Sequence, residues 1–432
     1  MLAAPPPAPL LFVAALLALG SVALLLWGFR SLRRKRMIEN IPTSKVKGVF
    51  LGLNEVKGEV VCDAPLRSFL AGSRCVYYRY SVEEEWRKTE TYRDKDGKTQ
   101  TRTTSGWNTV DSGTFDTVFV LRDDTGDLRV DPAGAEIHAT RVFSESCGPS
   151  DPLYYGKGPA SSIMNSTHRR KFSESALPVD DRIYVLGPAR LREDVVEPEI
   201  ARDRHAEIYL ISVKRESQIS GGYGRGAFFK LFFAALLLFG LSMLFSAPGS
   251  RNVSEAFGRA LPLALPLLAV FAGIVLVYYL VLVYNGLVSV RERAEMALSM
   301  IDVQLRRRHN LIPQLVACVQ GFSGYEQVTQ ERLAALRTKG DDTASLKSLF
   351  ALVEDYPDLK ANTNFAHLQA QLVDCEDRVA LAREFYNQTV TALRNRLQTL
   401  PDSLLKGLGR FKELDYSAAQ AFERTAPRLG LD

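Results

Sequence analysis

The chain has 432 residues, a formal net charge of +5 and 24% charged residues. Its length predicts more than one domain, and the small net charge argues against nucleic acid as a partner. The five cysteines form no C-x-x-C pair, which argues against a disulfide framework or a zinc site and favours free thiols in a reducing compartment.

The first predicted element is a membrane-spanning helix over residues 9–29, where the segment PLLFVAALLALGSVALLLWGF carries no charge. Its length matches the hydrocarbon core of a bilayer at helical rise. A cleaved signal peptide would carry basic residues before the apolar core, whereas here they follow it. The positive-inside rule therefore places the N-terminus outside and these basic residues in the cytoplasm. The orienting residues are Arg30, Arg33, Arg34, Lys35 and Arg36.

Two further spans are predicted at residues 229–247 and 261–284, joined by a short, weakly charged link. The basic residues that flank this helical hairpin, including Lys230 and Arg291, lie away from the link. The orientation agrees with that of the first span, so both soluble segments, 30–226 and 285–432, are expected in the cytoplasm.

The segment 30–226 is expected to be a mostly β (α+β) domain, because short runs rich in β-branched and aromatic residues alternate with turn signals. One hairpin is predicted at residues 116–132 and a polar, exposed one at 85–107 with a turn at Asp96-Gly97. A strand is expected to end at Gly187-Pro188, and a helix is possible near 161–175.

No catalytic or metal-binding motif is present in this segment: it has no H-E-x-x-H, no G-x-S-x-G and no P-loop. The run Glu83–Glu85 is interpreted as an exposed charge run, because neighbours in a strand face opposite sides. The glycine-rich GGYGRG at 221–226 is interpreted as a flexible hinge before the second span, in preference to a phosphate loop. No cofactor and no metal are predicted.

Four stretches of this segment, at residues 75–84, 123–136, 177–187 and 207–217, resemble the GIDE domain, also called the beside-a-membrane (BAM) domain. They include CVYYRYSVEE and LPVDDRIYVLG. That domain occurs in mitochondrial membrane-anchored E3 ubiquitin ligases, which attach a RING finger after the second span. A RING needs about eight Cys or His ligands, largely in C-x-x-C pairs. Because the chain has no such pairs, the resemblance does not extend to ligase activity, and we expect no enzyme.

Residues 285–432 are predicted to form an all-α, antiparallel helix bundle. Apolar residues from Leu287 to Leu305 recur every three or four positions, which indicates an amphipathic helix continuing from the third span. A helix restart is expected at 310–313. Further helices are predicted at 323–339, 341–360, 364–400 and 402–414. The candidate oligomer contacts are Asp302, Arg306, Arg307 and Arg308. The three arginines are expected to meet carboxylates of neighbouring helices or of another subunit, and Asp302 lies four positions before Arg306, where the two can pair on the helix surface.

This region resembles the LemA family over about residues 280–420, through YNGLV, IDVQLRRRHNLIPQLV and EDRVALAREFYNQTV. The resemblance implies a membrane-anchored helical bundle without established catalysis, in a family with members that organise bacterial membranes and organelles, including magnetosomes. Five polar residues of the matching motifs are interpreted as contacts within the bundle in preference to ligand-binding groups. These are Asn285, Asp302, Gln304, Asn364 and Asn387.

Two functions from different classes follow from this multi-domain membrane architecture. The first is a non-enzymatic scaffold that self-assembles through its helical domain and organises or shapes the bacterial inner membrane. The second is an adaptor in signalling or protein quality control, in which the β domain binds an unknown protein partner at an exposed strand edge such as CVYYRY. The expected partners are the lipid bilayer and further copies of the chain.

Overall fold

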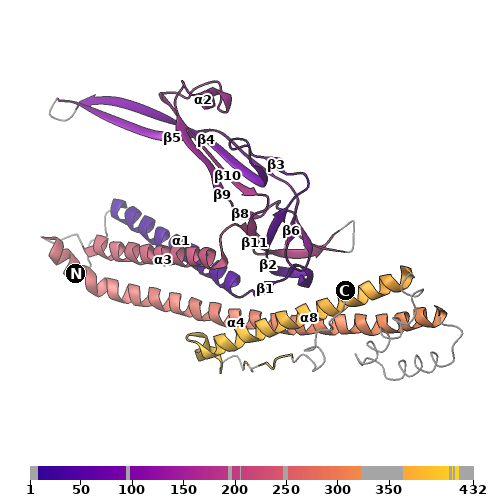
Figure 1. Cartoon of the computed structure of the whole chain (residues 1–432). Helices are drawn as coiled ribbons and strands as arrows, with labels where there is room; N and C mark the ends of the chain where they lie inside the picture. The colour runs from indigo at the N-terminus through magenta and orange to yellow at the C-terminus, as the bar shows by residue number, and fades with distance from the viewer. Residues whose placement is uncertain are drawn as a thin grey trace. The chain divides into compact units, whose positions relative to one another are not determined.

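The computed structural model of the chain describes residues 8–93, 98–192, 197–204, 206–246, 252–322, 363–407, 411 and 414–417. It separates into two compact units. One is the β-rich segment Thr43–Ile219, and the other combines Met1–Pro42 with Ser220–Asp432 and is helical where it is described (Figure 1).

The first sheet of the β-rich unit is barrel-like. Its order is β1-β2-β6-β7-β12-β11-β13-β8, and an added pairing of β2 with β11 closes part of it on itself. Fully buried Val56, Val60, Leu121, Val185 and Ile211 belong to the core cluster. The strands are β1 Thr43–Ser44, β2 Gly52–Val61, β6 Phe119–Arg122, β7 Asp127–Val130, β8 Glu136–His138, β11 Arg182–Leu191, β12 Pro198–Ile200 and β13 Leu210–Ser212, with the 3-10 helix η1 at Val46–Gly48.

The second sheet has the order β3-β4-β10-β9, with β5 paired to β4. The predicted hairpins at 85–107 and 116–132 are confirmed as the antiparallel pairs β4–β5 and β6–β7. The turn expected at Asp96-Gly97 lies outside the described residues. The elements are β3 Leu66–Arg67, β4 Arg74–Arg93, β5 Thr99–Asp116, β9 Thr140–Cys147, α2 Pro152–Gly156 and β10 Ser166–Pro178.

Three helices of the second unit are long and apolar enough to cross a membrane, as the sequence predicted. Large apolar side chains such as Phe12, Leu19 and Val277 are more than half exposed along them, which suits a surface facing lipid tails. The helices of this unit are α1 Ala8–Glu39, α3 Glu216–Ser246, α4 Val253–Phe322 and α8 Thr363–Gln398, with the 3-10 helix η2 at Asp402–Leu405.

Helices α1 and α3 are antiparallel and meet through small residues. The Ser21 hydroxyl donates to the Ala234 carbonyl at 3.0 Å. A Cβ at Gly28 would lie only 2.9 Å from Leu231 Cδ2. Because lipid tails are as apolar as leucine, such helices are held together by van der Waals packing and by hydrogen bonds between them.

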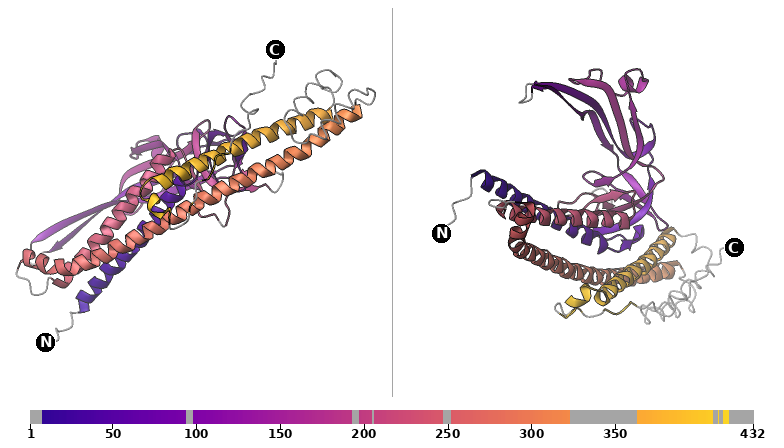
Figure 2. Two further views of the ribbon diagram at one scale, coloured as in Figure 1. Left: turned by 90° about the horizontal axis from the view of Figure 1, so that it is seen from below. Right: turned by 90° about the vertical axis from the view of Figure 1, so that its left-hand side faces the viewer.

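Helices α4 and α8 form an antiparallel pair, which both views of Figure 2 show side by side. The predicted apolar stripe is confirmed, since Leu287, Val290, Ala294, Ala297 and Ile301 are all buried. On α8 the facing side chains include Leu372, Cys375, Val379, Val390 and Leu393. The fold class expected for the C-terminal region is therefore observed.

Two boundaries predicted in the helical unit are wrong. GGYGRG is not a hinge but part of α3, where Ala227 is fully buried and Gly224 lies against Lys35 of α1. The helix restart at 310–313 is absent because α4 continues through Pro313 to Phe322. Buried Leu311 and Leu315 indicate that packing there outweighs the backbone hydrogen bond that proline removes.

Three local predictions in other segments also need correction. Residues 166–178 form strand β10 where a helix was considered, and its residues alternate in burial. Strand β11 does not end at Gly187-Pro188 but continues to Leu191 in pairing with β2 and β12. Of the helix predicted over 402–414, the described residues show the 3-10 helix η2 and no α-helix, and 408–410 and 412–413 lie outside the described residues. The helices predicted at 323–339 and 341–360 lie outside the described residues.

Replacing Gly28 with leucine should separate α1 from α3, because the new side chain overlaps Leu231. We expect a loss of about 1–3 kcal/mol in the free energy of unfolding. The control is Gly240→Leu, because a Cβ at Gly240 has no neighbour within 4 Å. The measurement is unfolding of the full chain in mixed micelles, followed by circular dichroism. Equal stability of the two variants would contradict the close contact.

Candidate functional site

The basic residues after the first apolar block occupy the last turns of α1 and contact other helices of the same unit. Arg36 Nη2 donates to the Tyr279 hydroxyl of α4 at 2.6 Å, with its guanidinium also 5.3 Å from that ring. Arg34 Nη1 lies 3.5 Å from the Tyr223 hydroxyl of α3. Lys35 pairs with Glu39 at 3.7 Å. The basic cluster that we used to orient the chain therefore also holds the end of α1 against α3 and α4.

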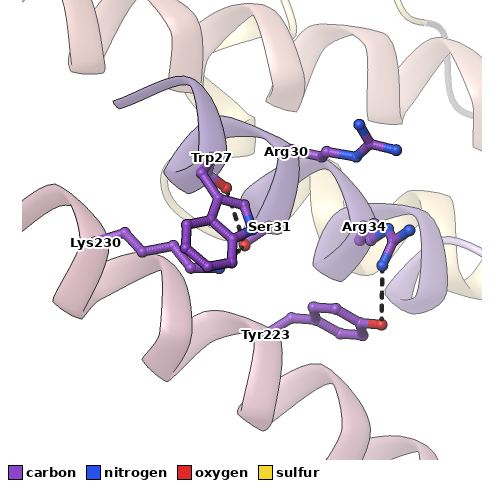
Figure 3. A pocket seen from close by; sticks show the side chains of 6 residues that line it. All are labelled: Trp27, Arg30, Ser31, Arg34, Tyr223 and Lys230. Carbon is purple, nitrogen blue, oxygen red and sulfur yellow. Dashed lines mark hydrogen bonds between the residues drawn. The ribbon is translucent and has the colours of Figure 1, made fainter. Parts of the chain in front are cut away.

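A basic and aromatic pocket of about 300 Å³ lies between α1 and α3 (Figure 3). Lys230 Nζ donates to Ser31 Oγ at 2.7 Å and lies 4.2 Å from the centre of the Trp27 ring. Ser31 in turn donates to the Trp27 carbonyl at 3.1 Å. The lining residues are Trp27, Arg30, Ser31, Arg34, Tyr223 and Lys230, none of them acidic.

Helical spacing explains why these residues meet. On α1, positions 27, 30, 31 and 34 recur every three or four residues and so share one face. On α3, Tyr223 and Lys230 are seven residues apart, which is close to two turns. The pocket lies where the apolar part of α1 ends and that of α3 begins, the level at which aromatic and basic side chains meet lipid headgroups.

A second cluster, which we call the juxtamembrane junction, joins the end of α1 to the α4–α8 pair. Arg396 of α8 donates through Nη1 to Asn40 Oδ1 and through Nε to Asp402 Oδ2, both at 2.5 Å. These groups cross α4 at Gly286, where an added Cβ would lie 3.0 Å from Arg396 Nη2 and from Asn40 Nδ2. Glycine at this point of the YNGLV motif therefore gives the two side chains room.

The junction is extended toward the apolar part of the helices by aromatic stacking. The rings of Phe29 and Tyr278 are 3.7 Å apart between centroids and nearly parallel. Val283 and Leu287 of α4 pack with Leu397 of α8 in one buried cluster. The C-terminal region is thus attached to the membrane helices by side-chain contacts as well as by the continuous backbone of α4.

The arginine triplet of α4 is divided between two environments. Arg307 lies 3.7 Å from Asp374 of α8, and Arg308, which is only 6% exposed, lies 2.9 Å from Glu376. Asp302 and Arg306 are exposed. Arg307 and Arg308 therefore meet carboxylates of the neighbouring helix, one of the two expected possibilities, while Asp302 and Arg306 remain predicted contacts of another copy.

The polar residues interpreted as bundle contacts also differ in their surroundings. Asn387 exchanges two hydrogen bonds with the backbone of Ser417, at 3.1 Å and 2.9 Å, and so ties α8 to the segment after η2. The backbone carbonyl of Gln304, and not its side chain, accepts from the Cys375 thiol at 3.2 Å. Asn285 is exposed. The interpretation fits Asn387 best.

In the β-rich unit, the interpretation of Glu83–Glu85 as an exposed run is wrong for Glu84. Its side chain is fully buried and pairs with fully buried Arg170, with Nη2 at 2.9 Å and Nε at 3.0 Å from Oε2. Ser166 donates to the other carboxylate oxygen. In the antiparallel pairing of β4 with β10, Glu84 lies directly opposite Arg170. Sequence reasoning missed this pair because the two residues are 86 positions apart.

Arg170 also organises the loop between β9 and β10. It donates to the carbonyls of Tyr154, Pro159 and Ser161 at 2.8–2.9 Å, and it stacks 3.9 Å above the Tyr154 ring. Burial raises the pKa of the Glu84 carboxyl, but the hydrogen bonds from Ser166 and Arg170 outweigh it, so that the pKa is below its usual value. The geometry is that of a satisfied structural ion pair.

No metal centre emerges from the described part of the chain, in which no three His, Cys, Asp or Glu side chains gather. Cys62, Cys75, Cys147 and Cys375 are free thiols. Burial, followed by the charge of Glu174, raises the pKa of the Cys75 thiol to about 11. A thiol with that pKa is protonated at neutral pH and therefore a poor nucleophile.

Replacing Arg396 with methionine should loosen both segments that it contacts in the juxtamembrane junction, the end of α1 at Asn40 and the turn at Asp402. Asp402 is then left buried without its partner. We expect a local loss of about 3 kcal/mol, seen as faster amide hydrogen exchange in both 36–40 and 399–405. The control is Arg378→Met, which removes only a half-exposed pair with Asp374. Faster exchange in one segment alone would show that Arg396 does not couple them.

Replacing Arg170 with methionine should cost the β-rich unit about 3–5 kcal/mol, because Glu84 stays buried and unpaired. The control Lys171→Met, which removes a partly exposed pair with Glu83, should stay within about 0.5 kcal/mol. The measurement is denaturant unfolding of the full chain.

The same pair predicts a pH dependence. Because the pKa of Glu84 is lowered in the folded state, its stabilisation is present above the usual carboxyl range, about pH 4–5, and is lost as the pH falls further. In Arg170→Met, burial is opposed by the hydrogen bond from Ser166 without the help of the guanidinium, so acid should destabilise the variant less than the wild type. An unchanged pH profile in the variant would contradict the pairing.

Comparison with known proteins supports the two regions separately. Residues 297–430 match the model of the LemA family, and residues 87–244 match the GIDE model, described as E3 Ubiquitin ligase. Magnetosome protein MamQ 2 of Paramagnetospirillum magneticum is 23% identical over 206 residues, covering 38% of this chain and 76% of the relative. MamQ of Magnetospirillum gryphiswaldense is 25% identical over 173 residues, covering 31% and 64%.

These matches agree with the observed architecture: α8 and the C-terminal part of α4 lie in the LemA match, and the elements from β5 to α3 lie almost entirely in the GIDE match. The chain is accordingly a fusion of a GIDE-like region and a LemA region on membrane-spanning helices.

Proposed function

We propose that the chain is a non-enzymatic, membrane-anchored scaffold that self-assembles through its LemA region and organises or shapes the bacterial inner membrane. The observation that carries the proposal is the continuity of α4. This helix runs without a break from the third apolar block into the pair with α8. From Tyr284 to Phe322 it extends about 57 Å at helical rise, as a stiff extension of a membrane span.

Counting membrane crossings supports one shared compartment for both soluble regions. If α1, α3 and the apolar part of α4 each cross the bilayer, the segment 30–226 and the segment after 284 must lie on the same side. The basic residues at 30–36 favour the cytoplasm for that side and the outside for the N-terminus. A scaffold with both regions on one face can act on that face of the membrane.

The exposed surface of α4 beyond the junction supports self-assembly. Asp302 and Arg306 present opposite charges one turn apart, and Val303 between them is 57% exposed. Such a surface is self-complementary, since Asp302 of one copy can pair with Arg306 of the next. The MamQ relatives are named as magnetosome proteins, which agrees with a role at a membrane.

A non-enzymatic role is part of the proposal despite the match to a family described as E3 Ubiquitin ligase. The 432 residues include five cysteines and no C-x-x-C pair, whereas a RING finger requires about eight ligands. The buried, fully hydrogen-bonded Arg170–Glu84 pair serves the loop around Tyr154 and offers no exposed acid or base.

The self-assembly test uses single charge reversals at the exposed pair of α4. Asp302→Lys and Arg306→Glu should each weaken every interface by roughly 1 kcal/mol and lower the mass of the assembly. The double swap Asp302→Arg/Arg306→Asp should restore it. The measurement is light scattering of the full chain in nanodiscs, with particle imaging.

The control reversal is Glu384→Lys, at an exposed position of α8. Reversal of the whole triplet is unsuitable, because Arg307 and Arg308 hold α4 to α8 within one chain. A monomeric or dimeric wild-type chain would contradict the scaffold, and unchanged mass in both single variants would contradict this surface.

The adaptor remains the second candidate, with a different strand from the one expected. CVYYRY is not an exposed edge, because β4 pairs with β10 on one side and with β3 and β5 on the other. In the described sheet, β9 pairs with β10 alone. Its outer edge can accept a partner strand. A small wild-type particle that retains a second protein would favour this function.

A further inference from the structure

We propose that the pocket between α1 and α3 binds a phosphate group, held by Arg34 and Lys230 with Arg30 beside them. The proposal does not depend on self-assembly and adds a ligand site to the membrane helices.

The lining of the pocket is positively charged. Three of its six lining residues are cations, and none is acidic. An anion that enters the pocket is attracted by these three charges, and the low dielectric of the membrane boundary strengthens the attraction. The arrangement therefore suits a ligand with a compact negative charge.

The positions of the polar groups suit phosphate in particular. Lys230 is held in place by Ser31 at 2.7 Å and by the Trp27 ring at 4.2 Å, so its ammonium is pre-oriented (Figure 3). Arg34 is similarly positioned by Tyr223, at 3.5 Å. Ammonium and guanidinium groups both form charge-assisted hydrogen bonds to phosphate oxygens. A volume of about 300 Å³ admits the group together with the atoms attached to it.

The position of the pocket relative to the apolar parts of the helices indicates the source of the phosphate. Trp27 is the third residue from the end of the first predicted span, and Lys230 is the second residue of the second. Both therefore lie where headgroups of the basic-side leaflet are expected. An anionic phospholipid and free inorganic phosphate present the same chemistry, and the experiment separates them.

The test is native mass spectrometry of the full chain in detergent, titrated with dioleoyl-phosphatidylglycerol and, separately, with dioleoyl-phosphatidylcholine. In Arg34→Gln/Lys230→Gln, the dissociation constant of the first phosphatidylglycerol should rise by about tenfold or more. Binding of phosphatidylcholine should not change. The matched control is Arg33→Gln/Arg225→Gln, which removes the same charge from the same two helices outside the pocket and should cost about threefold or less.

Two further arms complete the design. Arg34→Lys/Lys230→Arg keeps both charges and should bind within about threefold of wild type, which separates loss of charge from loss of folding. Displacement of the bound lipid by inorganic phosphate at millimolar concentration would identify a site for the free ion as well, and its failure would assign the site to the lipid. Equal losses in the pocket and control variants, or an equal loss of phosphatidylcholine, would overturn the proposal.

Discussion

The hydrocarbon core of a bilayer cannot hydrogen-bond to a peptide group, and the rest of this structure depends on that constraint. It requires each crossing segment to be a complete helix, as α1, α3 and the first part of α4 are. If all three segments cross, the β-rich unit between the first and second crossings shares a compartment with the region after the third. In the proposed topology the two regions of the fusion therefore meet the same partners.

Polar contacts in this protein are concentrated just beyond the apolar parts of the helices. Lys230 with Ser31, Arg36 with Tyr279, and Arg396 with Asn40 and Asp402 follow one another along the end of α1. Apart from Arg396 with Asp402, each links segments that are distant in sequence. A charge-assisted hydrogen bond gains strength where water is scarce. The helices of this unit are thus held together by polar contacts just beyond their apolar parts and by the apolar contacts between α4 and α8.

The elements with strong local periodicity were predictable from the sequence, and the contacts between distant elements were not. The apolar stripe of α4, the hairpin β6–β7 and the spans follow from residue spacing alone. Glu84 resembled an exposed acid because its neighbours are acidic, while the partner that buries it is 86 residues away on another strand. Lys230 was recognised only as a flanking charge, since the pocket requires α1 and α3 to pair across 199 residues. Pro313 and the glycines at 221–226 gave local signals for a break that helix packing overrides.

Because the backbone of α4 is unbroken, a movement of its apolar part is transmitted to the LemA region. Membrane helices adjust to the thickness of the surrounding lipid by changing their tilt. A change of about 10° at the third span, carried along about 57 Å of stiff helix, displaces the far end by about 10 Å. Lipid thickness or curvature at one depth is thereby converted into a sideways movement in solution, and neighbouring copies with the same geometry would feel the same local deformation as a change in their spacing.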